Sequence, residues 1–150
     1  FFFFFYSIAS QLLQLIDGET SRIAIAIFLL TDKEIAHALV KAKKRGVPIE
    51  IITDAGCLKE RTSKIGLLCD HGCTVYIYNH KDNTSLMHNK FAIFDAQKKV
   101  WTGSYNFTAA AGKQNQENVI VVQDAHTCEK FNKQFDKLKT RSYRYGGHRS

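Results

Sequence analysis

Residues 88–106 read HNKFAIFDAQKKVWTGSYN, and they predict a β-hairpin that is flanked by polar residues. The segments Lys90–Phe94 and Lys99–Thr102 are short and rich in aromatic and β-branched side chains, as strands are. Gln97 and Lys98 lie between them and supply the turn. The side chains that could take part in catalysis or ligand binding stand near the start of the first strand and directly after the second.

His88 and Lys90 precede and begin the first predicted strand. Residues two apart in a strand face the same way, so both side chains can meet one phosphate. An imidazole has an unperturbed pKa of about 6.5 and can attack phosphorus or pass a proton near neutral pH. An ammonium is a point charge suited to the non-bridging phosphate oxygens. Neither role requires a metal, so we expect no metal site and no cofactor.

The second strand is followed by Gly103, Ser104, Tyr105 and Asn106. Ser104 offers a hydroxyl and Asn106 a carboxamide, which are neutral donors for an oxyanion. Gly103 has no side chain, which allows backbone to approach a ligand. Together with His88 and Lys90, these groups indicate phosphodiester cleavage.

This pattern, H-x-K-x4-D followed by G-S-x-x-N, resembles the signature of the phospholipase D superfamily. All six signature positions match, at His88, Lys90, Asp95, Gly103, Ser104 and Asn106. Three further segments look like the small bacterial endonucleases of this superfamily: Arg22–Phe28, Ala36–Arg45 with the following Gly46-Val47-Pro48, and Gln116–Val119. The branch of mitochondrial cardiolipin hydrolases and piRNA-associated nucleases is similar in size and also has one motif, so the resemblance leaves the substrate open.

The resemblance implies that His88 is the nucleophile that forms a phosphohistidine. It implies that Lys90 and Asn106 bind the phosphate and that Ser104 supports them. Glu117 would orient His88, as the carboxylate of a catalytic triad fixes its imidazole; the alternative is a surface Glu at a strand edge. Asp95 is a candidate catalytic residue, but Asp is also common where a strand enters a turn, because it bonds local backbone.

A covalent two-step reaction also needs a general acid for the leaving oxygen and a base for water. One histidine cannot serve both roles at once, and none of the other five histidines has lysine two positions later. We therefore expect a twofold-symmetric homodimer in which His88 of each subunit faces one shared phosphate, which is also how the resemblance implies that single-motif members are built.

Strand and helix patterns alternate along the chain. They predict an α/β fold of the phospholipase D type, with a mixed β-sheet flanked by α-helices on both faces. Besides the hairpin strands, the predicted strands are Arg22–Phe28, Ile49–Thr53, Thr74–Tyr78 and Asn118–Val122. The predicted helices are Ile8–Ile16, Lys33–Lys44, Ser63–Cys69 and Ala125–Leu138. With 150 residues and no linker-like interior, residues 1–150 are expected to form one catalytic domain.

The formal net charge of +7 predicts an anionic partner, either nucleic acid (DNA or RNA) or a phospholipid membrane surface. Residues 139–150 are expected to form a basic C-terminal tail. With Lys137 included, its cations are interleaved with Tyr143 and Tyr145, which suits an arm that follows a nucleic-acid strand. A solvated, frayed terminus is the other interpretation.

Phe1–Tyr6 is a run of six aromatic residues with no initiating Met. It is too short to span a bilayer, which takes about 20 apolar residues. A hydrophobic first strand or packing contact and an interfacial lipid contact are both open interpretations. We expect that an upstream signal or anchor has been removed, which would place the protein in the periplasm, outside the cell or on a membrane.

The four cysteines are expected to be free thiols. They would permit two disulfides in an oxidising compartment, but a core of this size does not need them. Cys69 and Cys73, with His71 between them, give only a weak indication of zinc, because no second ligand pair is apparent.

The sequence therefore predicts a dimeric endonuclease that works without a metal through a phosphohistidine. The first alternative keeps this chemistry on a phospholipid such as cardiolipin. The second is a nucleic-acid-binding protein with a degenerate catalytic site, against which the intact motif argues.

Overall fold

The computed structural model describes residues 7–79 and 85–146. The aromatic run 1–6, the end of the basic tail with Arg149, and residues 80–84 lie outside the described residues. The helices are α1 (Ile8–Gly18), α2 (Lys33–Lys44), α3 (Ala55–Lys59), α4 (Ile65–Asp70), α5 (Ala109–Lys113) and α6 (Ala125–Thr140). The strands are β1 (Ile23–Ile27), β2 (Ile49–Asp54), β3 (Thr74–Tyr78), β4 (Lys90–Phe94), β5 (Lys99–Gly103), β6 (Val119–Gln123) and β7 (Ser142–Arg144).

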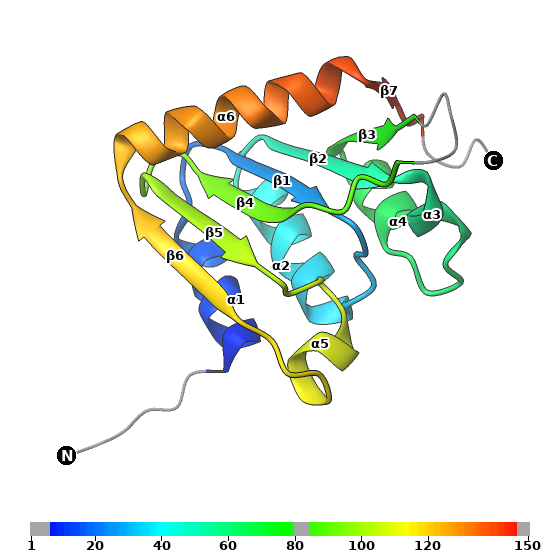
Figure 1. Cartoon of the computed structure of the whole chain (residues 1–150), viewed down its shortest axis with the longest axis horizontal. Coiled ribbons are helices and arrows are strands. Elements are labelled where there is room, and N and C mark those ends of the chain that lie inside the picture. The colour runs from blue at the N-terminus through cyan, green and yellow to red at the C-terminus, as the bar shows by residue number, and fades with distance from the viewer. Residues whose placement is uncertain (1–6, 80–84, 147–150) are drawn as a thin grey trace.

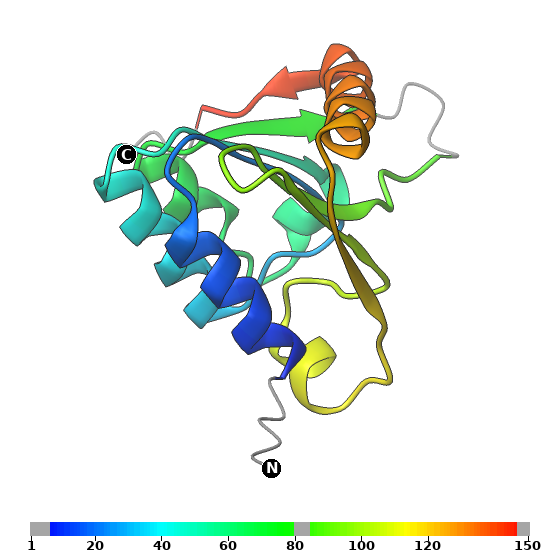
Figure 2. The same cartoon turned by 90° about the vertical axis from the view of Figure 1, so that its left-hand side faces the viewer.

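The described residues build one seven-stranded sheet in the order β6-β5-β4-β1-β2-β3-β7. β1, β2 and β3 are parallel, whereas β4, β5, β6 and β7 each run antiparallel to a neighbour. Figure 1 shows α6 crossing one face of this sheet, and Figure 2 shows α1, α2 and α4 on the other face. The predicted α/β fold with a mixed sheet and helices on both faces is confirmed.

Each face of the sheet has its own apolar cluster, because successive side chains of a strand point to opposite faces. On β4, Phe91 and Ile93 belong to the cluster beneath α6, while Ala92 and Phe94 belong to the cluster beneath α1 and α2. β1 is buried along its whole length, as expected for a central strand covered on both faces. This rigid centre fixes the strand ends at which the polar motif residues stand.

Three elements were not predicted, and all are short. α3 and α5 have five residues each, capped by Asp54 and Thr108. β7 has three residues and pairs with β3, so part of the predicted basic tail belongs to the sheet. A strand of this length carries almost no periodicity, and its pairing depends on β3 rather than on its own sequence.

The interpretation of residues 139–150 as a tail is therefore wrong for the part that the structure describes. Lys139 is in the last turn of α6, and its Nζ lies 2.9 Å from an oxygen of Glu50 and 4.9 Å from the ring centroid of Tyr76. Cations at 139 and 144 are thus held on ordered elements. Within the described residues, no helix is both long and apolar enough to cross a bilayer.

Candidate active site

The two halves of the motif meet at one edge of the sheet, where β1, β2 and β3 end. Because β4 is antiparallel to β1, its first residue, Lys90, stands opposite Ile27 at the end of β1. β5 returns antiparallel to β4 and ends at Gly103 on the same edge. The hairpin therefore places the start of β4 beside the end of β5 at this edge, as Figure 1 shows.

His88 and Lys90 are in direct contact. The Nζ of Lys90 lies 2.8 Å from the backbone oxygen of His88 and 3.1 Å and 3.4 Å from its two ring nitrogens, Nδ1 and Nε2. His88 is exposed and Lys90 is half-buried. A phosphate placed over the imidazole would therefore meet the ammonium without any rearrangement of β4.

Phe28 completes this corner and was not predicted as a site residue. Its ring packs against the His88 ring with the centroids 4.7 Å apart, and its centroid lies 5.7 Å from the Lys90 Nζ. The ring limits where the imidazole can turn, and it partly removes the ammonium from water. The only sequence signal was its position at the carboxyl end of a predicted strand.

Asn106 is held by the loop that follows β1. The N–H of Leu29 donates to Asn106 Oδ1 at 3.2 Å, and the N–H of Phe107 donates to the oxygen of Leu29 at 3.1 Å. Within the described residues no protein group accepts from Asn106 Nδ2. The carboxamide is thus fixed through its oxygen and keeps its N–H donors for a ligand, which fits the expected phosphate-binding role.

Ser104 and Glu117 bind each other. The Ser104 hydroxyl donates to Glu117 Oε2, and its oxygen accepts from the N–H of Asn118 at 3.1 Å. The structure places no hydrogen bond between Glu117 and His88, both of which it describes, so the expected orienting contact is not present in one subunit. Glu117 instead closes the loop between α5 and β6 onto the end of β5.

Gly103 is required for a reason other than the expected approach to a ligand. A Cβ at this position would meet the carbonyl oxygen of Asn118 and lie 2.9 Å from the Cα of Val119. Gly103 pairs with Val119 in the β5–β6 ladder. The missing side chain therefore admits the neighbouring strand and brings Glu117 to the site.

The charge of Lys90 is tuned by its surroundings. Burial lowers the pKa of Lys90, and the negative charge of Glu117 opposes that change. The two residues therefore form an electrostatic pair across the site, although their side chains share no hydrogen bond. Glu117 stabilises the charged form of the residue that is expected to bind phosphate.

Asp54 was not predicted as a site residue, yet it positions the segment before His88. Its buried carboxylate accepts from the N–H of Met87 at 2.9 Å and from the N–H of Gly56 at 2.8 Å. Met87 is itself fully buried in the cluster beneath α6. The backbone that carries His88 is thus tied to the end of β2. A buried acid at the end of a strand was the available signal.

Asp95 lies at the opposite end of β4 from Lys90. Its Oδ2 is 3.3 Å from a guanidinium nitrogen of Arg22, and its N–H donates to the Arg22 oxygen. Arg22 also pairs with Glu50 at 3.0 Å. Asp95 therefore has the structural role that its turn position left open, and the structure does not bring it to the site.

Five predicted site residues thus lie at one edge of the sheet: His88, Lys90, Ser104, Asn106 and Glu117. Asp95 lies outside this group. Among the described residues, no three His, Cys, Asp or Glu side chains come together as a potential metal site. All four cysteines are free, and the thiol of Cys69 donates to the backbone oxygen of Tyr145 at 3.5 Å.

A family model described as "Cardiolipin synthase, PLD-like domain" matches residues 12–139. The chain belongs to the phospholipase D superfamily. It is 38% identical to a phospholipase D of Rickettsia bellii over 85% of this chain and 61% of that protein. It is 32% identical to the mitochondrial cardiolipin hydrolase of Mus musculus over 86% of this chain and 57% of that protein.

Two solved structures share the fold. The phospholipase D family member Nuc from Salmonella typhimurium has a TM-score of 0.83 and 29% identity, over 91% of this chain and 90% of that chain. NucT from Helicobacter pylori has a TM-score of 0.84 and 25% identity over the same shares. The chain spans only part of the curated relatives that it matches, for example 61% of the Rickettsia bellii protein and 57% of the mouse protein. The predicted membership of the phospholipase D superfamily is confirmed.

Proposed function

We propose that this protein is a phosphodiesterase that works without a metal, and that it is an endonuclease acting on DNA or RNA through a phosphohistidine. The observation that carries the proposal is the contact of His88 with Lys90 beside the free amide donor of Asn106. A nucleophile, a cation and a neutral donor at one edge of the sheet are the groups that cleavage of a phosphodiester requires.

The chemistry follows from these three groups. A ring nitrogen of His88 attacks phosphorus, the bond from phosphorus to the leaving oxygen breaks, and that oxygen takes a proton. Lys90 and Asn106 neutralise and hold the non-bridging oxygens as charge develops on them. The group that gave its proton to the leaving oxygen then takes a proton from water, the water oxygen attacks phosphorus, the bond to His88 breaks, and the phosphomonoester leaves.

The proton for the leaving oxygen must come from a second group, because His88 is occupied as the nucleophile. Within the described residues of one subunit, no other histidine forms a hydrogen bond or a ring contact with His88 or Lys90. We infer that a homodimer supplies His88 of the partner subunit across a twofold axis. The exposure of His88 is compatible with that arrangement.

The test is cleavage of a labelled single-stranded oligonucleotide in excess EDTA. We expect activity in the wild type and a loss of about 10³-fold or more in His88→Ala. His126→Ala is the matched control, because His126 is an exposed residue in the first turn of α6. Equal activity in His88→Ala and His126→Ala would refute the role of His88, and activity that EDTA abolishes would refute the metal-free mechanism.

A phospholipid is the second candidate substrate, because relatives named phospholipase D and mitochondrial cardiolipin hydrolase match most of this chain. The same site would then cleave the phosphodiester of cardiolipin or a related lipid. Cleavage of cardiolipin vesicles with no cleavage of the oligonucleotide would favour the lipid.

A further inference from the structure

Two pockets flank the segment that carries His88, and both are lined partly by α6. The first, here called the β4 pocket, has a volume of about 360 Å³ and includes Asn89, Lys90, Lys130 and Gln134. The second, here called the β7 pocket, has about 520 Å³ and includes Tyr78, Ser85, Arg141 and Tyr143. The β4 pocket thus shares Lys90 with the candidate active site.

One face of α6 joins the two pockets. Lys130 and Gln134 are one turn apart and line the β4 pocket, and Arg141 caps the helix and lines the β7 pocket. Lys137 stands one turn before Arg141 and two turns after Lys130, so the same face carries it. These four residues are called the α6 track.

The cations of the α6 track differ from their neighbours in having no carboxylate partner. Within the described part of the chain, Lys130, Lys137 and Arg141 are exposed and form no ion pair. By contrast, Lys133 pairs with Glu129 at 3.3 Å, and Lys139 pairs with Glu50. The track therefore presents positive charge that forms no ion pair with a carboxylate of the described residues.

Both pockets include a residue that is close along the chain to His88 of the candidate active site. Asn89 of the β4 pocket is next to His88, and Ser85 of the β7 pocket is three residues before it. Three residues of chain span at most about 11 Å. A ligand in either pocket therefore lies within reach of a polymer whose phosphate is at His88.

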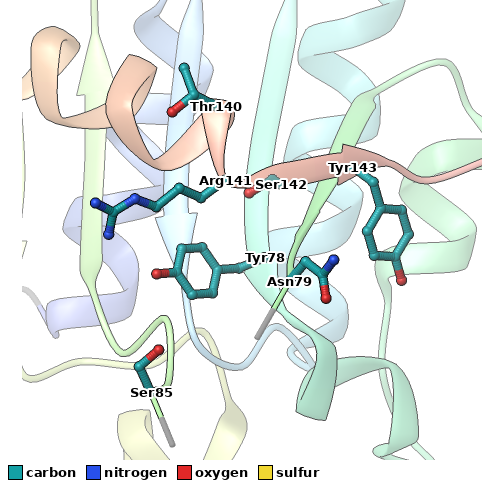
Figure 3. A pocket seen from close by; sticks show the side chains of 7 residues that line it. All are labelled: Tyr78, Asn79, Ser85, Thr140, Arg141, Ser142 and Tyr143. Atoms are coloured by element: carbon teal, nitrogen blue, oxygen red, sulfur yellow. The ribbon is translucent and has the colours of Figure 1, made fainter. Parts of the chain in front are cut away.

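Aromatic rings line both pockets. Tyr143 is 49% exposed in the β7 pocket, and Phe131 lines the β4 pocket. Figure 3 shows Arg141 and Tyr78 extending their polar ends to the same side of the β7 pocket. Grooves that bind single strands combine cations for the backbone with rings on which bases stack.

From these observations, and resting on the proposed phosphodiesterase function, we infer that the α6 track binds the nucleotides on either side of the cleaved phosphate in a single-stranded nucleic acid. Lys130, Lys137 and Arg141 contact the backbone phosphates. The pockets receive neighbouring bases, so the substrate class is a single strand of several nucleotides rather than an isolated phosphodiester.

The binding test uses His88→Ala protein, which does not cleave, and a fluorescent 20-nucleotide single strand. Each phosphate contact to a single strand contributes about 0.7 to the slope of log affinity against log salt. Adding Lys130→Gln, Lys137→Gln and Arg141→Gln together should make that slope shallower by about 2. Lys133→Gln is the matched control, since Lys133 is paired with Glu129 and lines neither pocket, and its loss should change the slope by less than about 0.3.

The kinetic test compares the oligonucleotide with bis(p-nitrophenyl) phosphate, which is too small to reach the pockets. In the triple variant, the ratio of kcat/KM for the oligonucleotide to that for the small diester should fall at least tenfold against Lys133→Gln. An equal ratio and slope in the two variants would overturn the α6 track. The inference would also be overturned if the triple variant lost binding to cardiolipin vesicles but bound the oligonucleotide as the wild type does. Failure of the wild type to cleave either diester would instead refute the proposed function.

Discussion

Glu19 offers a quantitative test of how the hairpin is held. It is fully buried between α1 and β1, and its Oε2 accepts from the N–H groups of Ser21, Arg22 and Ala96 at 2.8, 3.2 and 2.9 Å. Its Oε1 accepts from the N–H and the side-chain amide of Gln97, both at 3.3 Å. One carboxylate therefore accepts hydrogen bonds from two backbone N–H groups of the turn between β4 and β5.

Glu19→Gln keeps the shape and replaces one acceptor by a donor. If the amide oxygen takes the place of Oε2, the amide nitrogen faces the N–H of Gln97, which is left without an acceptor at a cost of about 1–3 kcal/mol. The Gln97 side chain still donates to the oxygen of Leu15 at 2.9 Å. The remaining bonds lose a charged acceptor, which costs about 0.5 kcal/mol each. We expect a total loss of about 3 kcal/mol.

The assay is urea unfolding followed by the fluorescence of Trp101, the single tryptophan, which is buried on β5. Burial opposes ionisation of Glu19, but the N–H donors of Ala96, Ser21 and Arg22 outweigh it and lower its pKa. Its stabilising effect is therefore complete above the unfolded pKa of about 4.3 and is lost as pH falls through the lower folded value. The gap between wild type and variant should narrow below that pH.

Glu129→Gln is the matched control, because Glu129 is an exposed acid on α6 paired only with Lys133. Such i,i+4 pairs contribute about 0.3–0.5 kcal/mol. A gap below 1 kcal/mol for Glu19→Gln at pH 7, or a gap that stays constant down to pH 3, would refute the reasoning.

Three other substitutions test the site. Gly103→Ala should lower the free energy of unfolding by about 1–3 kcal/mol, because its Cβ meets the backbone of β6; a loss below 0.5 kcal/mol in urea would show that the strands can separate freely. Glu117→Gln removes the charge that supports the ammonium of Lys90, so the alkaline limb of the pH–rate profile should move to lower pH; an unmoved limb would exclude Lys90 as the titrating group. Asp54→Asn puts an amide donor against the N–H of Met87 or of Gly56 and loosens the segment before His88, so kcat should fall at least tenfold while circular dichroism is unchanged; a wild-type kcat would exclude Asp54 from positioning His88.

The sequence was most informative where local pattern and burial agree. The strands of the hairpin and β3 were predicted within one residue, because buried strands have dense apolar patterns that no other element explains. β7 could not be predicted, since three residues gain their strand conformation only by pairing with β3. The site followed the same rule. Strand alternation was enough to bring His88 and Lys90 together.

The roles of acidic residues were harder to predict, because a carboxylate has several possible partners and the sequence does not reveal which one is near. Asp95 matched a catalytic signature but bonds Arg22 at the far end of β4. Glu117 was expected to orient His88 and instead accepts from Ser104. Asp54 was overlooked because the N–H of Met87, from which it accepts, is 33 positions away and belongs to the backbone.

The two ends of β4 have different roles, one in the stability of the fold and the other in the proposed reaction. At one end, Glu19 and the Asp95–Arg22 pair hold the turn and the strand ends. At the other end, Lys90 contacts His88 and the ring of Phe28, and among the described residues it forms no ion pair that a phosphate would have to displace. A sheet buried on both faces keeps the two ends in fixed relation. Damage at the Glu19 end should therefore reduce the fraction of folded enzyme and leave the turnover of each folded molecule unchanged.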